Sequence, residues 1–143
     1  MFRRVTAALG MVIAASLAGM APAPAAQVSP TPGPQLVCSV FGGPTGAGNC
    51  STSTHSPANS YSVLFTLTSV SASDVTGWTV PSQNVSGSGP GCAAGQLQCW
   101  VTIRSTDVDP VSVTVTVSYH TVSIFLQHRT ATVTVPGRCP AAC

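Results

Sequence analysis

The clearest pattern in the chain is an alternation of apolar and hydroxyl residues close to its C-terminal end. From Val111 to Tyr119, every odd position is apolar or aromatic and every even position is serine or threonine. A period of two is typical of a β-strand with one buried face and one face in water, and β-branched residues suit such a surface. The pattern therefore predicts a strand whose apolar face packs against a second layer.

A similar alternation predicts a strand over residues 99–104. It directs one set of side chains toward the core and the other set toward solvent. The inward set is Cys99, Val101 and Ile103, and the outward set is Trp100, Thr102 and Arg104. The other predicted strands are 36–41, 61–70, 77–80 and 130–135.

Turn signals separate these segments. Polar, glycine-containing loops are expected over 42–60 and 86–91, and a bend over 127–129. After Tyr119 the apolar phase shifts by one residue, which predicts a turn or bulge near His120. With about seven short strands and no run of helical period, we expect an all-β domain built as a single antiparallel β-sandwich stapled by disulfides. An up-and-down barrel is the alternative.

The N-terminus has the pattern of a secretory signal peptide. Arg3 and Arg4 precede an apolar stretch over 5–20, and Ala23 and Ala25 supply the small residues that a signal peptidase requires. An uncleaved anchor is the alternative. The predicted organisation is a signal peptide over 1–25, a proline-rich leader over 26–35 and a β-sandwich domain over 36–143. We expect a secreted, extracellular protein.

Charge is scarce once the signal peptide is removed. Loss of Arg3 and Arg4 leaves three of the five basic residues against three acidic ones, so the net charge becomes zero. Nucleic-acid binding needs a basic stripe that three arginines do not provide. Electrostatic binding to an anionic membrane is excluded for the same reason.

Six cysteines, an even number in a chain with a secretion signal, predict three disulfides. The spacing contains no C-x-x-C pair, so a zinc site is a poor fit. The favoured pairs are Cys92 with Cys99 and Cys38 with Cys50, and the main competitor joins Cys38 to Cys139. The sixth cysteine is Cys143.

Two short segments carry a resemblance to known domains. Phe-Thr-Leu-Thr at 65–68 and Gly-Trp-Thr-Val at 77–80 are similar to a strand–turn–strand of bacterial cellulose- and chitin-binding modules. The Val/Thr-rich segment resembles immunoglobulin-like domains of secreted actinomycete proteins. These resemblances imply an immunoglobulin-like sandwich. The chain departs from both patterns, because the exposed binding tryptophans have no match beyond Val80 and Leu97 replaces the tyrosine that precedes the second immunoglobulin cysteine.

Candidate catalytic residues are few. His55, His120 and His128 are available as bases, but no G-x-S-x-G nucleophile elbow occurs. Asp107 and Asp109 are the only closely spaced carboxylates, and the Asp-Pro pair at 109–110 is ordinary turn chemistry. We expect a non-catalytic protein that uses no cofactor or metal.

Trp100 is the main candidate for ligand binding, with Thr102 and Arg104 beside it on the outward face. An exposed aromatic ring on a flat sheet stacks on a sugar ring or anchors a protein partner, so a polysaccharide or an extracellular protein is the expected partner. Large aromatic side chains are usually well buried. This favours the alternative in which the leader or the loop between Cys92 and Cys99 covers the ring.

A second function class is a secreted protease inhibitor that presents the loop between Cys92 and Cys99. A pinned loop loses little entropy on binding. Its contact residues would be Gly95, Gln96, Leu97 and Gln98. A third possibility is a structural module without a ligand. The long Val/Thr strands are also prone to pair with another chain at a sheet edge, which would give a dimer or a fibre-like assembly. The oligomeric state is left open.

Overall fold

The computed structural model describes residues 33–41, 43, 45–89, 91–122 and 125–139. The predicted signal peptide (1–25) and the predicted leader up to residue 32 lie outside these ranges, as does Cys143. The described residues all belong to one compact unit.

The described residues form nine β-strands and one 3₁₀ turn, so the all-β prediction is confirmed. The strands are β1 (Gln35–Val40), β2 (Thr45–Ala47), β3 (Asn49–Ser51), β4 (Ser60–Thr68), β5 (Val75–Thr79), β6 (Val85–Ser88), β7 (Gln98–Arg104), β8 (Val111–His120) and β9 (Leu126–Val135). The 3₁₀ turn η1 spans Ala72–Asp74. Within this described part, no helix is long and apolar enough to cross a membrane.

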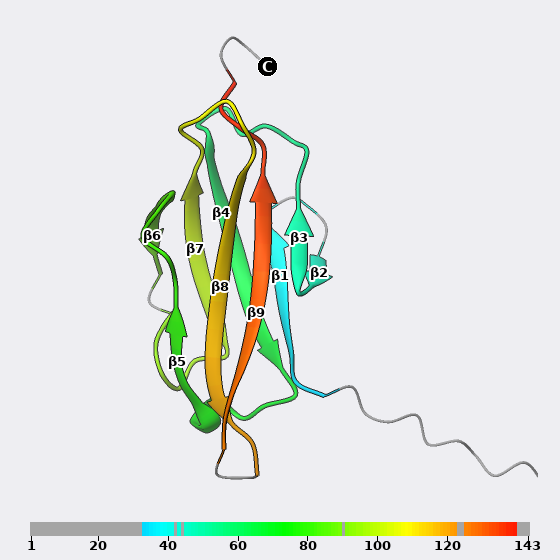
Figure 1. The fold of residues 1–143 in the computed structure, drawn as a ribbon, viewed down its shortest axis with the longest axis vertical. Helices are drawn as coiled ribbons and strands as arrows, with labels where there is room; N and C mark the ends of the chain where they lie inside the picture. The colour runs from blue at the N-terminus through cyan, green and yellow to red at the C-terminus, as the bar shows by residue number, and fades with distance from the viewer. Residues whose placement is uncertain (1–32, 42, 44, 90, 123–124, 140–143) are drawn as a thin grey trace, which may run out of the picture. The chain divides into compact units, whose positions relative to one another are not determined.

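The strands form two sheets (Figure 1). The five-stranded sheet has the order β2-β1-β4-β7-β6, and the four-stranded sheet has the order β3-β9-β8-β5. Neighbouring strands are antiparallel, except that β3 runs parallel to β9. Both sheets contribute to one apolar core, because the alternating residues of β4, β7, β8 and β9 that are buried form a single cluster.

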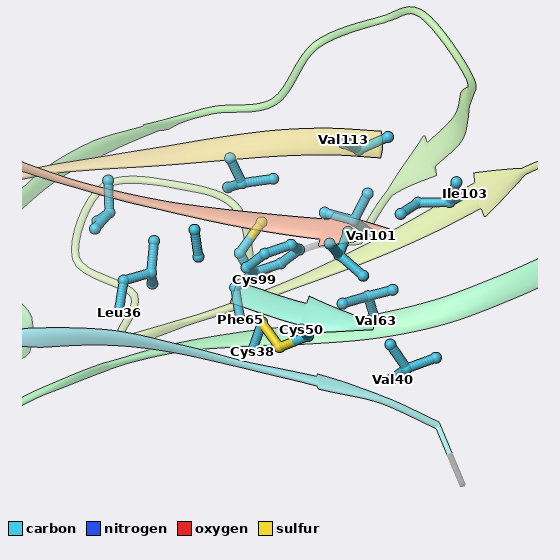
Figure 2. Close-up of a cluster of buried hydrophobic side chains, with 14 of the residues drawn as sticks. Leu36, Cys38, Val40, Cys50, Val63, Phe65, Cys99, Val101, Ile103 and Val113 are labelled. Carbon is cyan, nitrogen blue, oxygen red and sulfur yellow. A yellow bond between two sulfur atoms is a disulfide. The ribbon is translucent and has the colours of Figure 1, made fainter. Parts of the chain in front are cut away.

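Valines and aromatic side chains fill this core. Phe65 on β4 and Tyr119 on β8 are among its largest fully buried side chains. Figure 2 shows Phe65 amid side chains that come from β1, β4 and β7. The odd positions of Val111–Tyr119 are all buried, as the alternation predicts.

The chain changes sheets at both sides of the core. On one side, Gly48 joins β2 to β3: its N–H donates to the Leu36 carbonyl at 2.9 Å, and its own carbonyl accepts from the Thr132 N–H at 2.8 Å. Gly48 has a φ of +76°, which a residue without Cβ adopts at little cost. On the other side, residues 80–84 join β5 to β6. The strands that these connections join, β2, β3, β5 and β6, are the short edge strands of the two sheets.

These edge strands correct several sequence-based expectations. The segment 42–60 was expected to be a loop but contains β2 and β3, and the expected loop over 86–91 begins within β6. The expected bend over 127–129 lies inside β9, which pairs with β8 along its length. β8 and β9 lie inside the strand order, but β3 pairs only with residues 132–134 of β9, and β5 only with residues 116–119 of β8. The expectation that these strands pair with another chain stays a prediction.

The favoured disulfides are confirmed. Cys38–Cys50 joins β1 to β3, and therefore one sheet to the other, while Cys92–Cys99 closes the loop before β7. The competing Cys38–Cys139 pair is wrong. Cys139 is also disulfide-bonded. Disulfides of this kind are typical of oxidising, extracellular environments.

Candidate functional site

Strand β7 divides its side chains between the core and the solvent. Cys99, Val101 and Ile103 are fully buried, as the alternation predicts. The opposite face of the strand belongs to the outer face of the five-stranded sheet. Its outward side chains, in chain order, are Gln98, Trp100, Thr102 and Arg104. We call this set the β7 line.

Trp100 is the exposed aromatic residue of the β7 line. It is 43% exposed, so the loop between Cys92 and Cys99 leaves part of this residue open to solvent. Most of the predicted leader (26–32) lies outside the described residues. On one side its cross-strand neighbour is Leu64 of β4, which is half-buried. Trp100 therefore has an apolar cross-strand partner and still presents surface to solvent.

The other side of Trp100 is occupied by a glycine. The Gly89 N–H donates to the Trp100 carbonyl at 2.7 Å. A Cβ at Gly89 would lie 3.1 Å from the Trp100 Cβ, closer than most real contacts. Gly89 thus allows the edge of the sheet to approach Trp100 without placing a side chain beside the ring.

Thr102 and Arg104 are held through their backbones. The Thr102 carbonyl accepts from the Ser86 hydroxyl at 3.4 Å, and the Arg104 N–H donates to the Asn84 carbonyl at 2.8 Å. Within the described ranges, neither the Thr102 hydroxyl nor the Arg104 guanidinium has a hydrogen-bond or ion-pair partner. Both groups are available to a ligand.

The Cys92–Cys99 disulfide fixes the backbone next to Trp100. Its Cα atoms are 4.3 Å apart, and Cys99 is fully buried in the core. Trp100 therefore projects from a rigid strand. Preorganised sites of this type lose little entropy when a ligand binds.

A shallow pocket of about 350 Å³ lies at the start of the β7 line. Its polar side chains are uncharged: the hydroxyl of Thr66 and the amides of Gln96 and Gln98. Neutral amides and hydroxyls are good partners for the hydroxyl groups of a sugar. A hydroxyl both donates and accepts hydrogen bonds, and a side-chain amide carries an NH₂ donor beside a carbonyl acceptor.

The proposed inhibitor loop uses its backbone internally. The Gly95 N–H donates to the Val75 carbonyl at 2.9 Å, and the Leu97 carbonyl accepts from the Leu67 N–H at 2.8 Å. Between them, the Gln96 carbonyl accepts from the Trp78 indole N–H at 3.0 Å. The Leu97 side chain packs against the core. The loop is pinned, but its peptide groups face its own domain.

Sequence reasoning missed Phe41. This residue follows β1, and its N–H donates to the Ser62 carbonyl at 2.9 Å, which extends the pairing with β4. It is 84% exposed. The alternation of Leu36, Cys38 and Val40 would have placed Phe41 on the outer face of the same sheet as Trp100, and this was the available signal.

The outer face of the four-stranded sheet has a different chemistry. Hydroxyls on β8 and β9 pair across the strands: Ser112 with Thr134 at 2.9 Å and Thr114 with Thr132 at 2.8 Å. We call these four residues the hydroxyl ladder. Among the described residues, no group of three or more His, Cys, Asp or Glu side chains is placed to hold a metal ion.

Comparison with protein-family models, with curated proteins and with solved structures finds no match for this chain. The function must therefore be argued from the chemistry of the site.

Proposed function

We propose that this protein is a secreted, non-catalytic extracellular binding domain that holds a polysaccharide on the β7 line. Secretion is supported by the N-terminal signal pattern and by the disulfides, which are typical of oxidising compartments. The binding role is supported by the outward side chains of β7.

We further propose that the fold is an immunoglobulin-like sandwich. The immunoglobulin fold has strands ordered A-B-E-D in one sheet and C-F-G in the other. The orders β1-β4-β7-β6 and β5-β8-β9 match these sequences when β1 is taken as A and β9 as G. The short strands β2 and β3 then follow strand A, which accounts for nine strands in the described chain where seven were expected.

The observation that carries the binding role is the exposed ring of Trp100 on a rigid face that contains hydroxyls and amides. A pyranose ring has an apolar face and a rim of hydroxyls, so it needs an aromatic surface and neutral hydrogen-bonding groups together. Trp100 supplies the first, and Thr102 and Gln98 supply the second. A protease inhibitor is less well supported, because the peptide groups of its candidate loop bind within the domain.

The test is a pull-down of the oxidised protein on insoluble cellulose, chitin and bacterial cell wall, with the Trp100→Ala variant alongside. We expect the native protein to bind at least one of these materials and Trp100→Ala to weaken binding about tenfold or more, the scale of an aromatic hot spot. The matched control is Phe125→Ala, which removes another exposed ring, 68% exposed, on the loop between β8 and β9.

Loss of binding in Trp100→Ala but not in Phe125→Ala would support the proposal. A native protein that binds none of the materials would overturn it and make a protein partner the next hypothesis. Equal losses in the two variants would show that the protein adsorbs through any exposed apolar side chain.

A further inference from the structure

The β7 line ends in a cation. Successive outward side chains of a strand are about 6.8 Å apart, so the Arg104 Cα lies about 14 Å along the strand from the Trp100 Cα. Thr102 lies between them on the same face. A single extended ligand that stacks on Trp100 and follows the strand therefore reaches Arg104.

Arg104 is exposed and has no carboxylate partner in the described part of the chain. The outward residues of β1, β4 and β7 include no acidic side chain. The three aspartates are elsewhere: Asp74 is in η1, and Asp107 and Asp109 are in the turn that follows β7. The Asp107 carboxylate accepts from the Thr106 hydroxyl at 3.5 Å.

An uncompensated guanidinium on an otherwise neutral face favours a ligand with negative charge. Its planar fork of donors matches a carboxylate, which it binds through two parallel hydrogen bonds. A nucleic acid would require several such cations in a row, and the line contains one.

We infer that the ligand is an acidic polysaccharide, with one sugar ring stacked on Trp100 and a carboxylate of a neighbouring sugar paired with Arg104. This inference rests on the proposed function, since it specifies the ligand class of the same site. Neutral sugars would use the Trp100 end of the line alone, and their affinity would not depend on Arg104.

The test compares two soluble polymers with the same β-linked glucose backbone: carboxymethylcellulose, which carries carboxylates, and hydroxyethylcellulose, which is neutral. Binding of the oxidised protein is measured by calorimetry. We expect about three- to fivefold tighter binding to the charged polymer at low salt, the scale of one exposed ion pair, and loss of the difference at about 0.5 M NaCl.

Variants separate the groups involved. Arg104→Gln should bind both polymers with the same affinity, the one that the native protein has for the neutral polymer. The control Arg138→Gln removes the same charge from an exposed residue beyond β9 and should behave as the native protein does. Trp100→Ala should lose binding to both polymers.

These measurements distinguish failure of the acidic-ligand inference from failure of the polysaccharide-binding proposal. If the native protein binds both polymers equally and Arg104→Gln changes nothing, the acidic-ligand inference is wrong while polysaccharide binding stands. If the native protein binds neither polymer here and none of the materials in the pull-down, both proposals are wrong. If Arg138→Gln weakens binding as much as Arg104→Gln, net charge and not the β7 line selects the ligand, and the inference is again overturned.

Discussion

The two outer faces of this domain are built from similar residues and use them differently. On the four-stranded sheet, the hydroxyls of the hydroxyl ladder donate and accept across β8 and β9 at 2.8–2.9 Å. On the five-stranded sheet, Thr102 and Arg104 have no side-chain partner within the described chain. The hydroxyl ladder pairs its side chains across two strands of one face. On the other face Thr68 and Ser86 donate to backbone carbonyls, but Thr102 and Arg104 leave their polar groups open to solvent.

This difference shows that the number of hydroxyls on a sheet does not by itself identify a binding face. A hydroxyl that already has a partner must lose that hydrogen bond, or share it, before it serves a ligand. Thr102 has no such competition, and it lies beside the exposed ring of Trp100. The face with fewer hydroxyl pairs is therefore the better binding surface.

The most severe test of this comparison is to remove the disulfide that joins the two sheets. The double variant Cys38→Ala/Cys50→Ala removes the disulfide between β1 and β3. Its loop spans a sequence separation of 12, for which chain entropy predicts a loss of about 3 kcal/mol in the free energy of unfolding. Urea denaturation measures this loss.

Each face is a property of its own sheet, so polysaccharide binding by the folded double variant should not change. If binding were lost while the variant is still folded, ligand binding by the β7 line would depend on the disulfide between the sheets. The comparison of two independent faces would then be wrong.

Sequence alternation was sufficient to predict the core and the outward direction of the β7 line. A period of two fixes which side chains share a face, and burial of one set follows from the need to cover it. The same reasoning failed for β2, β3 and β6. These strands are three or four residues long and contain glycine or polar residues, so their pairing depends on neighbours distant in sequence and not on their own pattern.

The exposure of Trp100 is a second property that its own strand does not predict. Alternation predicts its direction, but its exposure depends on what the adjacent edge strand places beside it. Gly89 supplies no side chain there. Because this contact depends on how the chain returns from β6 to β7, no local signal revealed it.

A smaller effect on stability tests whether the hydroxyl pairs of the hydroxyl ladder stabilise the four-stranded sheet. A double-mutant cycle with Thr114→Val and Thr132→Val replaces two paired hydroxyls by methyl groups of the same shape. The coupling free energy between the two positions should be about 0.5 kcal/mol, typical of an exposed cross-strand pair. Urea denaturation of the four proteins measures it. A coupling of zero would show that the pairs do not stabilise this face.

The smallest expected change in stability is at Thr102, and it separates the two faces most directly. Thr102→Val removes a hydroxyl that has no partner in the described structure, so the free energy of unfolding should change by less than about 0.5 kcal/mol. Polysaccharide affinity should fall about threefold, the scale of one hydrogen bond to a ligand. Thr114→Val is the matched control, and its affinity should not change because its hydroxyl belongs to the opposite face. If Thr114→Val weakened binding and Thr102→Val did not, the ligand would lie on the hydroxyl ladder, and the assignment of the binding face would be reversed.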